Sequence, residues 1–425
     1  MVAHDPLSIA FEIREQLASE KRRLAFFIGA GTSMAVGFPG IQQLTDMVSA
    51  QLEEPYKTKF NTIRAEISAQ ANVEAVLDRI RTYCELIGKD EEKVYSCLKG
   101  CEATGLDAAV CKVICDIFCA DPPEGLSPHL IFAQWIGALR YNRDWPVEIF
   151  TTNYDLLIER AMETHGIPYF DGFGGSVKPF FLPESVEAEK TKKYDSIYPP
   201  RGWTRLWKIH GSINWSLVKD ENSQKERIAR LTTGKGVAGE GGVIFPSREK
   251  YIESRKLPYI AFQDRLRRLL IGGECLLIII GYSFSDEHLN EIIFQGLRSN
   301  PHLAVLALMY GDSISTMSGN RRVVPDEILR LGKEFRNLSI YGPDKACIGG
   351  ISGQWDVSDD KKTESEYLSF WNKESKTFTL GSFKEFAEYL EKVIGFQSVK
   401  SQNEEVVNSS KGDQKIEDSG GNIED

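Results

Sequence analysis

The side chains of this chain that could do chemistry cluster in four short polar or glycine-rich stretches. The first follows an apolar run at residues 23–28 and consists only of small residues, Gly29, Ala30, Gly31, Thr32 and Ser33. Glycines let backbone amides come close to a diphosphate, and a helix beginning behind them adds partial positive charge. We therefore expect a phosphate-cradling turn. A plain tight turn is the alternative, because Met34 stands where the fingerprint Gly-x-Gly-x-x-Gly has its third glycine.

Two further stretches carry polar side chains suited to catalysis. The second is Thr152-Asn153-Tyr154-Asp155, and the third is His210-Gly211-Ser212. An imidazole, with a reference pKa of about 6.5, accepts a proton at neutral pH, and an amide orients a water or a hydroxyl group without bringing a charge. His210 and Asn153 are therefore the candidate catalytic residues. The alternatives are a hydrogen-bonded histidine at a strand end and an asparagine that caps a helix.

The fourth stretch, Gly281, Tyr282 and Ser283, follows the apolar run at 275–280. We expect it to contribute to the same binding site as the first stretch. For Ser283 and Asp286, capping of the following helix is an equally good interpretation.

Buried strands must position these stretches, because each stretch follows an apolar run. The expected strands are 23–28, 147–150, 205–209, 241–246, 275–280 and 302–310. Runs without alternation, such as 275–280, are typical of strands buried on both faces. Helical patterns between the strands predict an α/β fold with a doubly wound, mainly parallel, Rossmann-like sheet. Loops after parallel strands meet at one edge of such a sheet, so we expect the four stretches to converge there.

The pattern also predicts how the chain divides into domains. Residues 1–40 and 146–312 form the α/β domain. Residues 41–145 are helical throughout and far longer than a crossover requires, which predicts a helical insertion. Residues 313–399 form a C-terminal module whose aromatic side chains are expected to build a core of their own. The tail at 400–425 has almost nothing to bury and is expected to be disordered.

Composition excludes some classes of protein. The net charge of −10 disfavours broad electrostatic binding of nucleic acid. No apolar run approaches membrane-spanning length and no secretory signal is visible, so we expect a cytoplasmic protein without a membrane interaction. The eight cysteines include no Cys-x-x-Cys pair of the kind that zinc sites favour. Small, reduced core residues are the preferred interpretation of them.

Taken in order, the four stretches resemble the motif set of the sirtuin superfamily. Thr-Asn-Tyr-Asp at 152–155 and Gly-Tyr-Ser-Phe-Ser-Asp at 281–286 are most similar to the sirtuin-like, NAD-hydrolysing domains of bacterial anti-phage defence proteins. The resemblance implies that residues 29–33 hold the diphosphate of NAD, that Asn153 lies by the nicotinamide ribose, and that His210 is the catalytic base. It further implies that Thr152 and Asp155 support the ribose and nicotinamide, and that Gly281, Tyr282 and Ser283 lie on the adenosine side.

The same resemblance implies a function. We expect an NAD+ glycohydrolase that releases nicotinamide and ADP-ribose as an abortive-infection effector, working as a homo-oligomer controlled by a HerA-class ATPase. Protein-deacylating sirtuins have Asp-Phe-Arg after their Gly-x-Pro, whereas here 37–39 continues into Gly40-Ile41-Gln42. They also have a four-cysteine zinc ribbon, whereas residues 213–272 contain no cysteine, so no zinc is expected. An NAD-dependent deacylase or ADP-ribosyltransferase, and a non-catalytic NAD or ADP-ribose binding module, are the alternatives.

Overall fold

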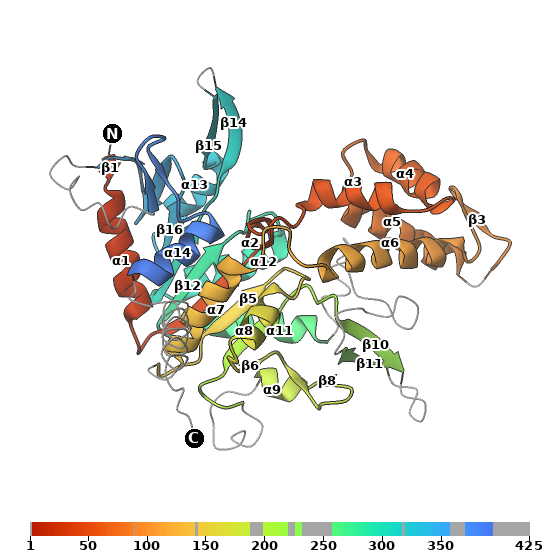
Figure 1. The fold of residues 1–425 in the computed structure, drawn as a ribbon, viewed down its shortest axis with the longest axis horizontal. Coiled ribbons are helices and arrows are strands. Elements are labelled where there is room, and N and C mark those ends of the chain that lie inside the picture. The colour runs from red at the N-terminus through yellow and green to blue at the C-terminus, as the bar shows by residue number, and fades with distance from the viewer. Residues whose placement is uncertain are drawn as a thin grey trace, which may run out of the picture.

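A ten-stranded sheet forms the centre of the molecule (Figure 1). The computed structural model describes residues 2–88, 90–140, 143–187, 199–219, 226–231, 257–316, 319–357 and 370–393. The strand expected at 241–246 and the tail expected at 400–425 lie outside the described residues.

The strand order of the central sheet is β1-β18-β17-β16-β13-β12-β2-β5-β9-β6. All neighbouring strands from β16 to β6 are parallel, and β17 runs antiparallel to β16 and β18. The prediction of a mainly parallel, doubly wound sheet is confirmed. The strands are β1 (Val2–His4), β2 (Arg23–Ile28), β5 (Glu148–Thr151), β6 (Tyr169–Phe170), β9 (Thr204–Lys208), β12 (Cys275–Ile280), β13 (Leu303–Leu308), β16 (Leu338–Tyr341), β17 (Lys345–Ile348) and β18 (Ile351–Trp355).

The register of the central strands brings their ends to one level. Ile28, the last residue of β2, pairs with Ile280 on one side and with Thr151 on the other. Thr151 in turn lies beside Lys208 of β9. The four polar stretches therefore leave the sheet from adjacent strands at the same edge, as the parallel arrangement predicts.

Helices cover both faces of the sheet, because successive side chains of the central strands point to opposite faces. Phe26 packs edge-on against Phe132, with 5.0 Å between ring centroids, on the face covered by α1 (Pro6–Ala18), α7 (Ser127–Leu139), α8 (Leu157–Thr164) and α14 (Phe383–Val393). Phe27 packs against Tyr282 at 4.8 Å on the other face, which α11 (Tyr259–Ile271), α12 (Glu287–Ser299) and α13 (Asp326–Glu334) cover.

A helical lobe, defined here as α3 to α6, extends from the sheet to the right of Figure 1. It consists of α3 (Ile41–Gln51), α4 (Tyr56–Ile67), α5 (Val73–Ile87) and α6 (Glu102–Cys119), with a short hairpin, β3 (Val94–Tyr95) and β4 (Leu98–Lys99), between the last two. These helices share a core separate from those on the sheet. Helix α7, by contrast, packs on the sheet with α8 and α14. The domain boundaries drawn from the sequence stay a prediction.

The C-terminal aromatic residues belong to the core of the sheet. Phe378, Phe383 and Phe386 lie in one cluster with Phe26 of β2, and the hydroxyl of Tyr389 donates a hydrogen bond to the Ala10 carbonyl at 2.6 Å. The expectation that these side chains build a core of their own is wrong. Helix α14 has a strongly apolar face, and the sequence does not say which surface that face covers.

The remaining elements are short. A second, four-stranded sheet has the order β10-β11-β8-β7, and two further hairpins pair β14 with β15 and β19 with β20. None of the described helices has both the length and the apolar character that crossing a bilayer requires. The bounds are α2 (Gly31–Met34), α9 (Pro183–Glu187), β7 (Phe173–Gly174), β8 (Phe180–Phe181), β10 (Trp215–Lys219), β11 (Glu226–Arg230), β14 (Asp312–Thr316), β15 (Gly319–Val323), β19 (Trp371–Asn372) and β20 (Thr377–Phe378).

The packing of α7 on α14 predicts a pH dependence of stability. His129 of α7 is 1% exposed, its ring centroid lies 4.8 Å from that of Phe383, and burial lowers its pKa from 6.5 to about 4. Its contribution to stability is complete above about pH 6.5 and is lost as the pH falls towards 4, because only the unfolded chain takes up the proton readily. We expect the free energy of unfolding to fall by about 1.4 kcal/mol per pH unit in this window from this group.

Urea denaturation between about pH 7 and pH 4.5 measures this slope. His129→Leu should flatten it. His165→Leu, at an exposed position, is the control and should leave it as it is. A slope that His129→Leu does not change would contradict the assignment.

Candidate functional site

The turns after β2 and β12 are in direct backbone contact. The amide of Gly31 donates to the carbonyl of Gly281 at 2.9 Å. A Cβ atom on Gly29 would lie 2.4 Å from that same oxygen, and one on Gly31 would lie 2.7 Å from the Gly281 Cα. No side chain fits at either position. The glycines that sequence analysis assigned to a binding turn are therefore also required for two strands to turn side by side.

Asn153 is held by the first turn through its side-chain nitrogen. Nδ2 lies 3.1 Å from the Gly29 carbonyl, 3.1 Å from Thr32 Oγ1 and 2.9 Å from Ser33 Oγ. A carbonyl only accepts hydrogen bonds, so the contact with Gly29 fixes which end of the amide faces the turn. The other end, Oδ1, is buried and has no hydrogen-bond partner among the described residues. An unpaired buried acceptor is costly, and it is suited to receive a hydroxyl or a water.

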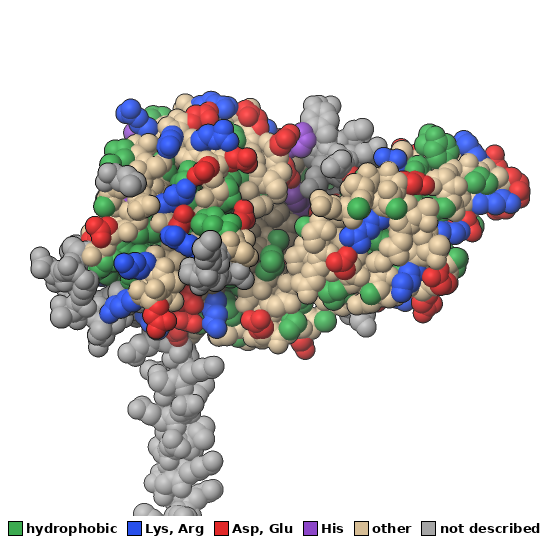
Figure 2. Space-filling view, turned by 90° about the horizontal axis from the view of Figure 1, so that it is seen from above, with side chains coloured by type: hydrophobic (Ala, Val, Ile, Leu, Met, Phe, Trp, Pro, Cys, Tyr) green, Lys and Arg blue, Asp and Glu red, His purple; other side chains and the backbone are tan. Residues whose placement is uncertain are grey.

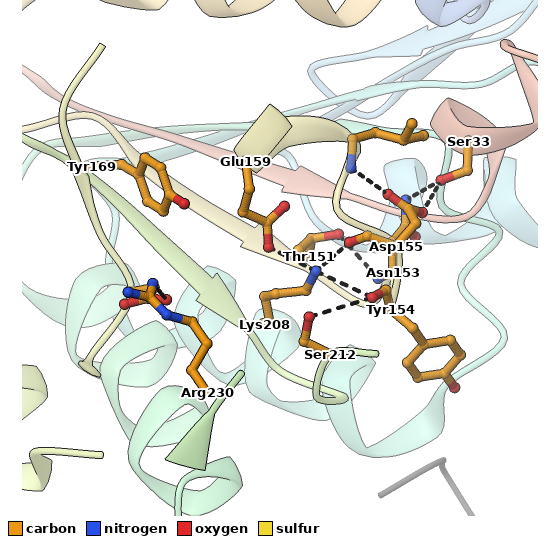
Figure 3. Close-up of polar contacts among 12 residues, drawn as sticks. Ser33, Thr151, Asn153, Tyr154, Asp155, Glu159, Tyr169, Lys208, Ser212 and Arg230 are labelled. Atoms are coloured by element: carbon orange, nitrogen blue, oxygen red, sulfur yellow. Dashed lines mark hydrogen bonds and ion pairs between the residues drawn. The ribbon is translucent and has the colours of Figure 1, made fainter. Parts of the chain in front are cut away.

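Asp155 joins the same network and begins the next helix. Ser33 Oγ donates to Asp155 Oδ2 at 2.5 Å, and Asp155 Oδ1 accepts from the amide of Leu157 at 3.1 Å, in the first turn of α8. Figure 3 shows Ser33, Asn153 and Asp155 side by side. The carboxylate thus bonds to the first residue of α8 and orients the Ser33 hydroxyl, which leaves the Ser33 oxygen free to accept from Asn153.

His210 is paired with the carboxylate that begins α12. Its Nε2 lies 3.1 Å from Asp286 Oδ2, and the two side chains are 13% and 10% exposed. The other carboxylate oxygen of Asp286 caps α12 by accepting from the amides of His288 and Leu289, both at 3.1 Å. When a neutral imidazole donates from Nε2, its lone pair lies on Nδ1. The pair can therefore hold a base in a fixed orientation.

A buried ion pair supports the loop that carries Asn153. Lys208 Nζ lies 2.9 Å from Glu159 Oε1, and the two side chains are 3% and 13% exposed. Lys208 also donates to the carbonyls of Tyr154 and Asp155, so its charge is fully hydrogen-bonded (Figure 3). Burial raises the pKa of Glu159, and the adjacent Lys208 opposes that rise. Through Lys208, the pair fixes the backbone at the end of the Thr-Asn-Tyr-Asp stretch.

The other residues that the sequence singled out take different positions. Ala30 and Ser283 are exposed, while the Thr152 amide continues the sheet by donating to the Ile28 carbonyl at 3.1 Å. The Tyr282 ring is buried against Phe27, and its hydroxyl donates to Asn290 Oδ1 at 2.9 Å. The side chain of Tyr282 is thus part of the core, and only its backbone faces the turn after β2.

Two partners at this edge could not be found from the sequence. Helix capping is one of the two interpretations that the sequence allows for Asp286, and the structure confirms it. Its pairing with His210 joins residues 76 positions apart, taking 286 minus 210. Glu74, from the helical lobe, accepts a hydrogen bond from the Tyr154 hydroxyl at 3.2 Å. Within the described residues, no group of three or more His, Cys, Asp and Glu side chains is arranged to hold a metal ion.

The surface is hollowed between the sheet and the helical lobe. Figure 2 shows this hollow from above, with histidine side chains in purple along it. The loops after β2, β5, β9 and β12 all end on this side of the sheet, because their strands are parallel and in register. These loops therefore leave the sheet on the side that faces the helical lobe (Figure 1).

Comparison with known proteins gives a family for part of the chain. A family model described as "SIR2-like domain" matches residues 147–327. None of the curated proteins matches the chain. Among solved structures, one titled "The Structural basis of Sirtuin Substrate Affinity" is similar over 70% of this chain and 86% of that chain, with 12% sequence identity and a TM-score of 0.31. That structural likeness is too low to support an argument.

The family match shows that the chain contains a sirtuin-like domain, as the resemblance of the motifs implied. The matched span includes Asn153, Asp155, His210 and Gly281, and it begins after the turn at 29–33. A SIR2-like domain implies the binding or use of NAD. The finer assignment of roles to single residues stays a prediction.

The contact between the two turns predicts the effect of substituting Gly281. This residue has φ +68°, and a Cβ on it would lie 2.7 Å from the Thr32 amide nitrogen. Gly166 has φ +61° with nothing within 4 Å of an added Cβ, which makes it a matched control. We expect Gly166→Ala to cost about 1–2 kcal/mol of unfolding free energy from backbone strain alone. Gly281→Ala should cost about 1–3 kcal/mol more, since the two turns must also separate.

Urea denaturation of the two variants and the parent chain measures the difference. Equal losses for the two alanine variants would show that the turns after β2 and β12 do not constrain each other.

Proposed function

We propose that this protein is an NAD+ glycohydrolase that cleaves NAD+ to nicotinamide and ADP-ribose. The observation that carries the proposal is the amide of Asn153, whose nitrogen is fixed by three contacts and whose buried oxygen has no partner in the described structure. An oriented acceptor of this kind fits a ribose hydroxyl or an attacking water. The sirtuin-like domain supplies the reason to choose NAD as the substrate.

Cleavage of NAD+ depends more on the orientation of the ribose and the water than on acid catalysis. In NAD+ the bond between ribose C1′ and the nicotinamide nitrogen breaks with its electrons moving to the ring, so a neutral pyridine leaves from a cation. The transition state resembles an oxocarbenium ion, as in other glycosyl transfers. Water then forms the new C1′–O bond and loses a proton. The protein must hold the ribose and the water and must accept that proton.

In this proposal His210 is the proton acceptor and Asp286 orients it. The contact between Nε2 and Asp286 leaves Nδ1 as the basic nitrogen and stabilises the imidazolium that forms. Asn153 holds the water or the ribose hydroxyl. The turn at residues 29–33 holds the diphosphate, residues 281–283 lie on the adenosine side, and Thr152 and Asp155 in the loop after β5 support the ribose and nicotinamide. No zinc enters this reaction.

The biological role rests on the resemblance of the motifs to defence proteins. An enzyme that consumes NAD is toxic unless it is restrained, so we propose an abortive-infection effector that is active in a homo-oligomer and is controlled by a HerA-class ATPase in the cytoplasm. A deacylase or ADP-ribosyltransferase, and a module that only binds NAD or ADP-ribose, are the outcomes against which the proposal is tested.

Loss of the amide or the imidazole should abolish turnover. We expect Asn153→Ala and His210→Ala each to lower kcat by about 10²- to 10⁴-fold, since orientation and general-base help contribute on that scale. The measurement is NMR of nicotinamide and ADP-ribose with NAD+ and the purified full chain, alone and with a candidate ATPase. Asn372→Ala is the matched control, because Asn372 accepts from the amides of Glu374 and Ser375, both at 3.0 Å, in the turn between β19 and β20. It should reduce stability by about 1 kcal/mol and leave kcat unchanged.

Three results would overturn this proposal. Full turnover in both site variants would show that Asn153 and His210 are not the catalytic residues. Nicotinamide release that depends strictly on an acyl-lysine peptide would indicate a deacylase. Tight NAD binding without any product, with and without the ATPase, would indicate a binding module.

The pairing of His210 with Asp286 predicts a separate effect. Asparagine caps a helix about as well as aspartate, so Asp286→Asn keeps α12 capped while it removes the charge beside the imidazole. We expect kcat to fall by at least about tenfold, because the imidazolium that forms during the reaction loses its counter-charge. An Asp286→Asn enzyme with the parent's kcat would show that the contact is structural.

A further inference from the structure

Tyr154 connects the helical lobe to both loops that carry the candidate catalytic residues. It stands between Asn153 and Asp155 in the chain, yet its hydroxyl reaches away from them to Glu74 Oε1 of α5, at 3.2 Å. Burial, together with the nearby Glu74 carboxylate, raises the pKa of Tyr154 well above its usual value. The phenol therefore stays protonated and remains a donor to Glu74 at any physiological pH.

The backbone of Tyr154 is bonded to the loop that carries His210. Its carbonyl accepts from the amide of Ile213 at 3.0 Å, and Ser212 Oγ and Lys208 Nζ each lie 3.4 Å away. Figure 3 shows Lys208 and Ser212 directed at this carbonyl. The two loops therefore move with Tyr154: one contains it, and the other is hydrogen-bonded to it from both sides of His210.

An apolar contact runs in parallel with these hydrogen bonds. Ile213 is fully buried within the core of the helical lobe, and Tyr154 and Leu156 pack against that same core. The helices α3 to α6 thus do not have a closed core of their own. Residues from the loops after β5 and β9 complete it, so a shift of the lobe relative to the sheet must displace both loops or expose Ile213 to water.

We propose that Glu74 is a positioning residue for NAD cleavage, which acts through the hydroxyl of Tyr154 to set the geometry of the Asn153 and His210 loops. This inference rests on the proposed function. Glu74 belongs to the helical lobe. Its hydrogen bond goes to Tyr154, the residue that follows Asn153 in the chain. Through Glu74, the helical lobe helps to set the geometry of the active site, although the motifs assign no chemistry to the lobe. Any partner that shifts α5 therefore alters turnover without contacting NAD.

The variants Glu74→Ala and Tyr154→Phe test the connection on the full chain in its most active assembly. We expect each to lower kcat by roughly 10- to 10²-fold with little change in KM, because a misplacement of about 1 Å has effects of this size. Glu74→Gln keeps a side-chain carbonyl that accepts from Tyr154, so it should restore most of kcat. The double variant should be no slower than the slower single variant, since both remove one bond.

The helical lobe contains a matched control. Tyr83 donates to Glu66 Oε2 at 2.9 Å, which is the same kind of bond within the lobe and outside the site loops. Tyr83→Phe should lower stability to a similar extent and leave kcat unchanged. If Tyr83→Phe and Tyr154→Phe reduce kcat equally, or if neither Glu74→Ala nor Tyr154→Phe reduces it, the positioning role is wrong.

A readout without catalysis separates this inference from the proposed function. Hydrogen–deuterium exchange should become faster at residues 151–155 and also at 208–213 in Glu74→Ala and Tyr154→Phe, and stay unchanged there in Tyr83→Phe. If the parent chain releases no nicotinamide, the proposed function fails, and exchange alone decides whether the lobe fixes the two loops. Unchanged exchange in both loops would overturn the inference whatever the activity.

Discussion

The backbone contact between the turns after β2 and β12 is the constraint on which the site depends. Gly31 and Gly281 share a hydrogen bond at 2.9 Å in a space where a Cβ atom would collide. This contact fixes the Gly29 carbonyl and the hydroxyls of Thr32 and Ser33, and those three oxygens hold the Asn153 amide. Two neighbouring turns thus determine the orientation of a side chain from a third strand.

The polar groups at this edge follow one physical pattern. Two carboxylates each have a structural partner and a second contact directed at the site: Asp155 accepts from the first residue of α8 and from Ser33, while Asp286 caps α12 and pairs with His210. A side chain that is hydrogen-bonded to the first turn of a helix is held in a fixed position by that helix. The catalytic candidates are therefore oriented by groups that the fold already needs, with no flexible side chain between them.

Much of this arrangement could be predicted from the sequence, because it depends on local signals. Apolar runs located β2 and β12, and the rule that parallel strands release their loops at one edge brought residues 29–33, 152–155 and 281–283 together. The strand β1 could not be found, since Val2–His4 is too short to show a period and pairs with β18 some 350 residues away. The pairs His210–Asp286 and Tyr154–Glu74 could not be predicted for the same reason, because a contact between distant segments leaves no pattern in the sequence of either segment.

A structure of the full chain with NAD+ bound, in the His210→Ala variant so that the ligand persists, tests the central claim most directly. We expect the nicotinamide ribose beside Asn153, with Oδ1 within hydrogen-bond distance of a ribose hydroxyl or a water on its free face. The diphosphate should lie at the turn of residues 29–33, with the adenosine beside residues 281–283. A dinucleotide bound elsewhere, or an Asn153 oxygen satisfied by the protein alone in that structure, would contradict it.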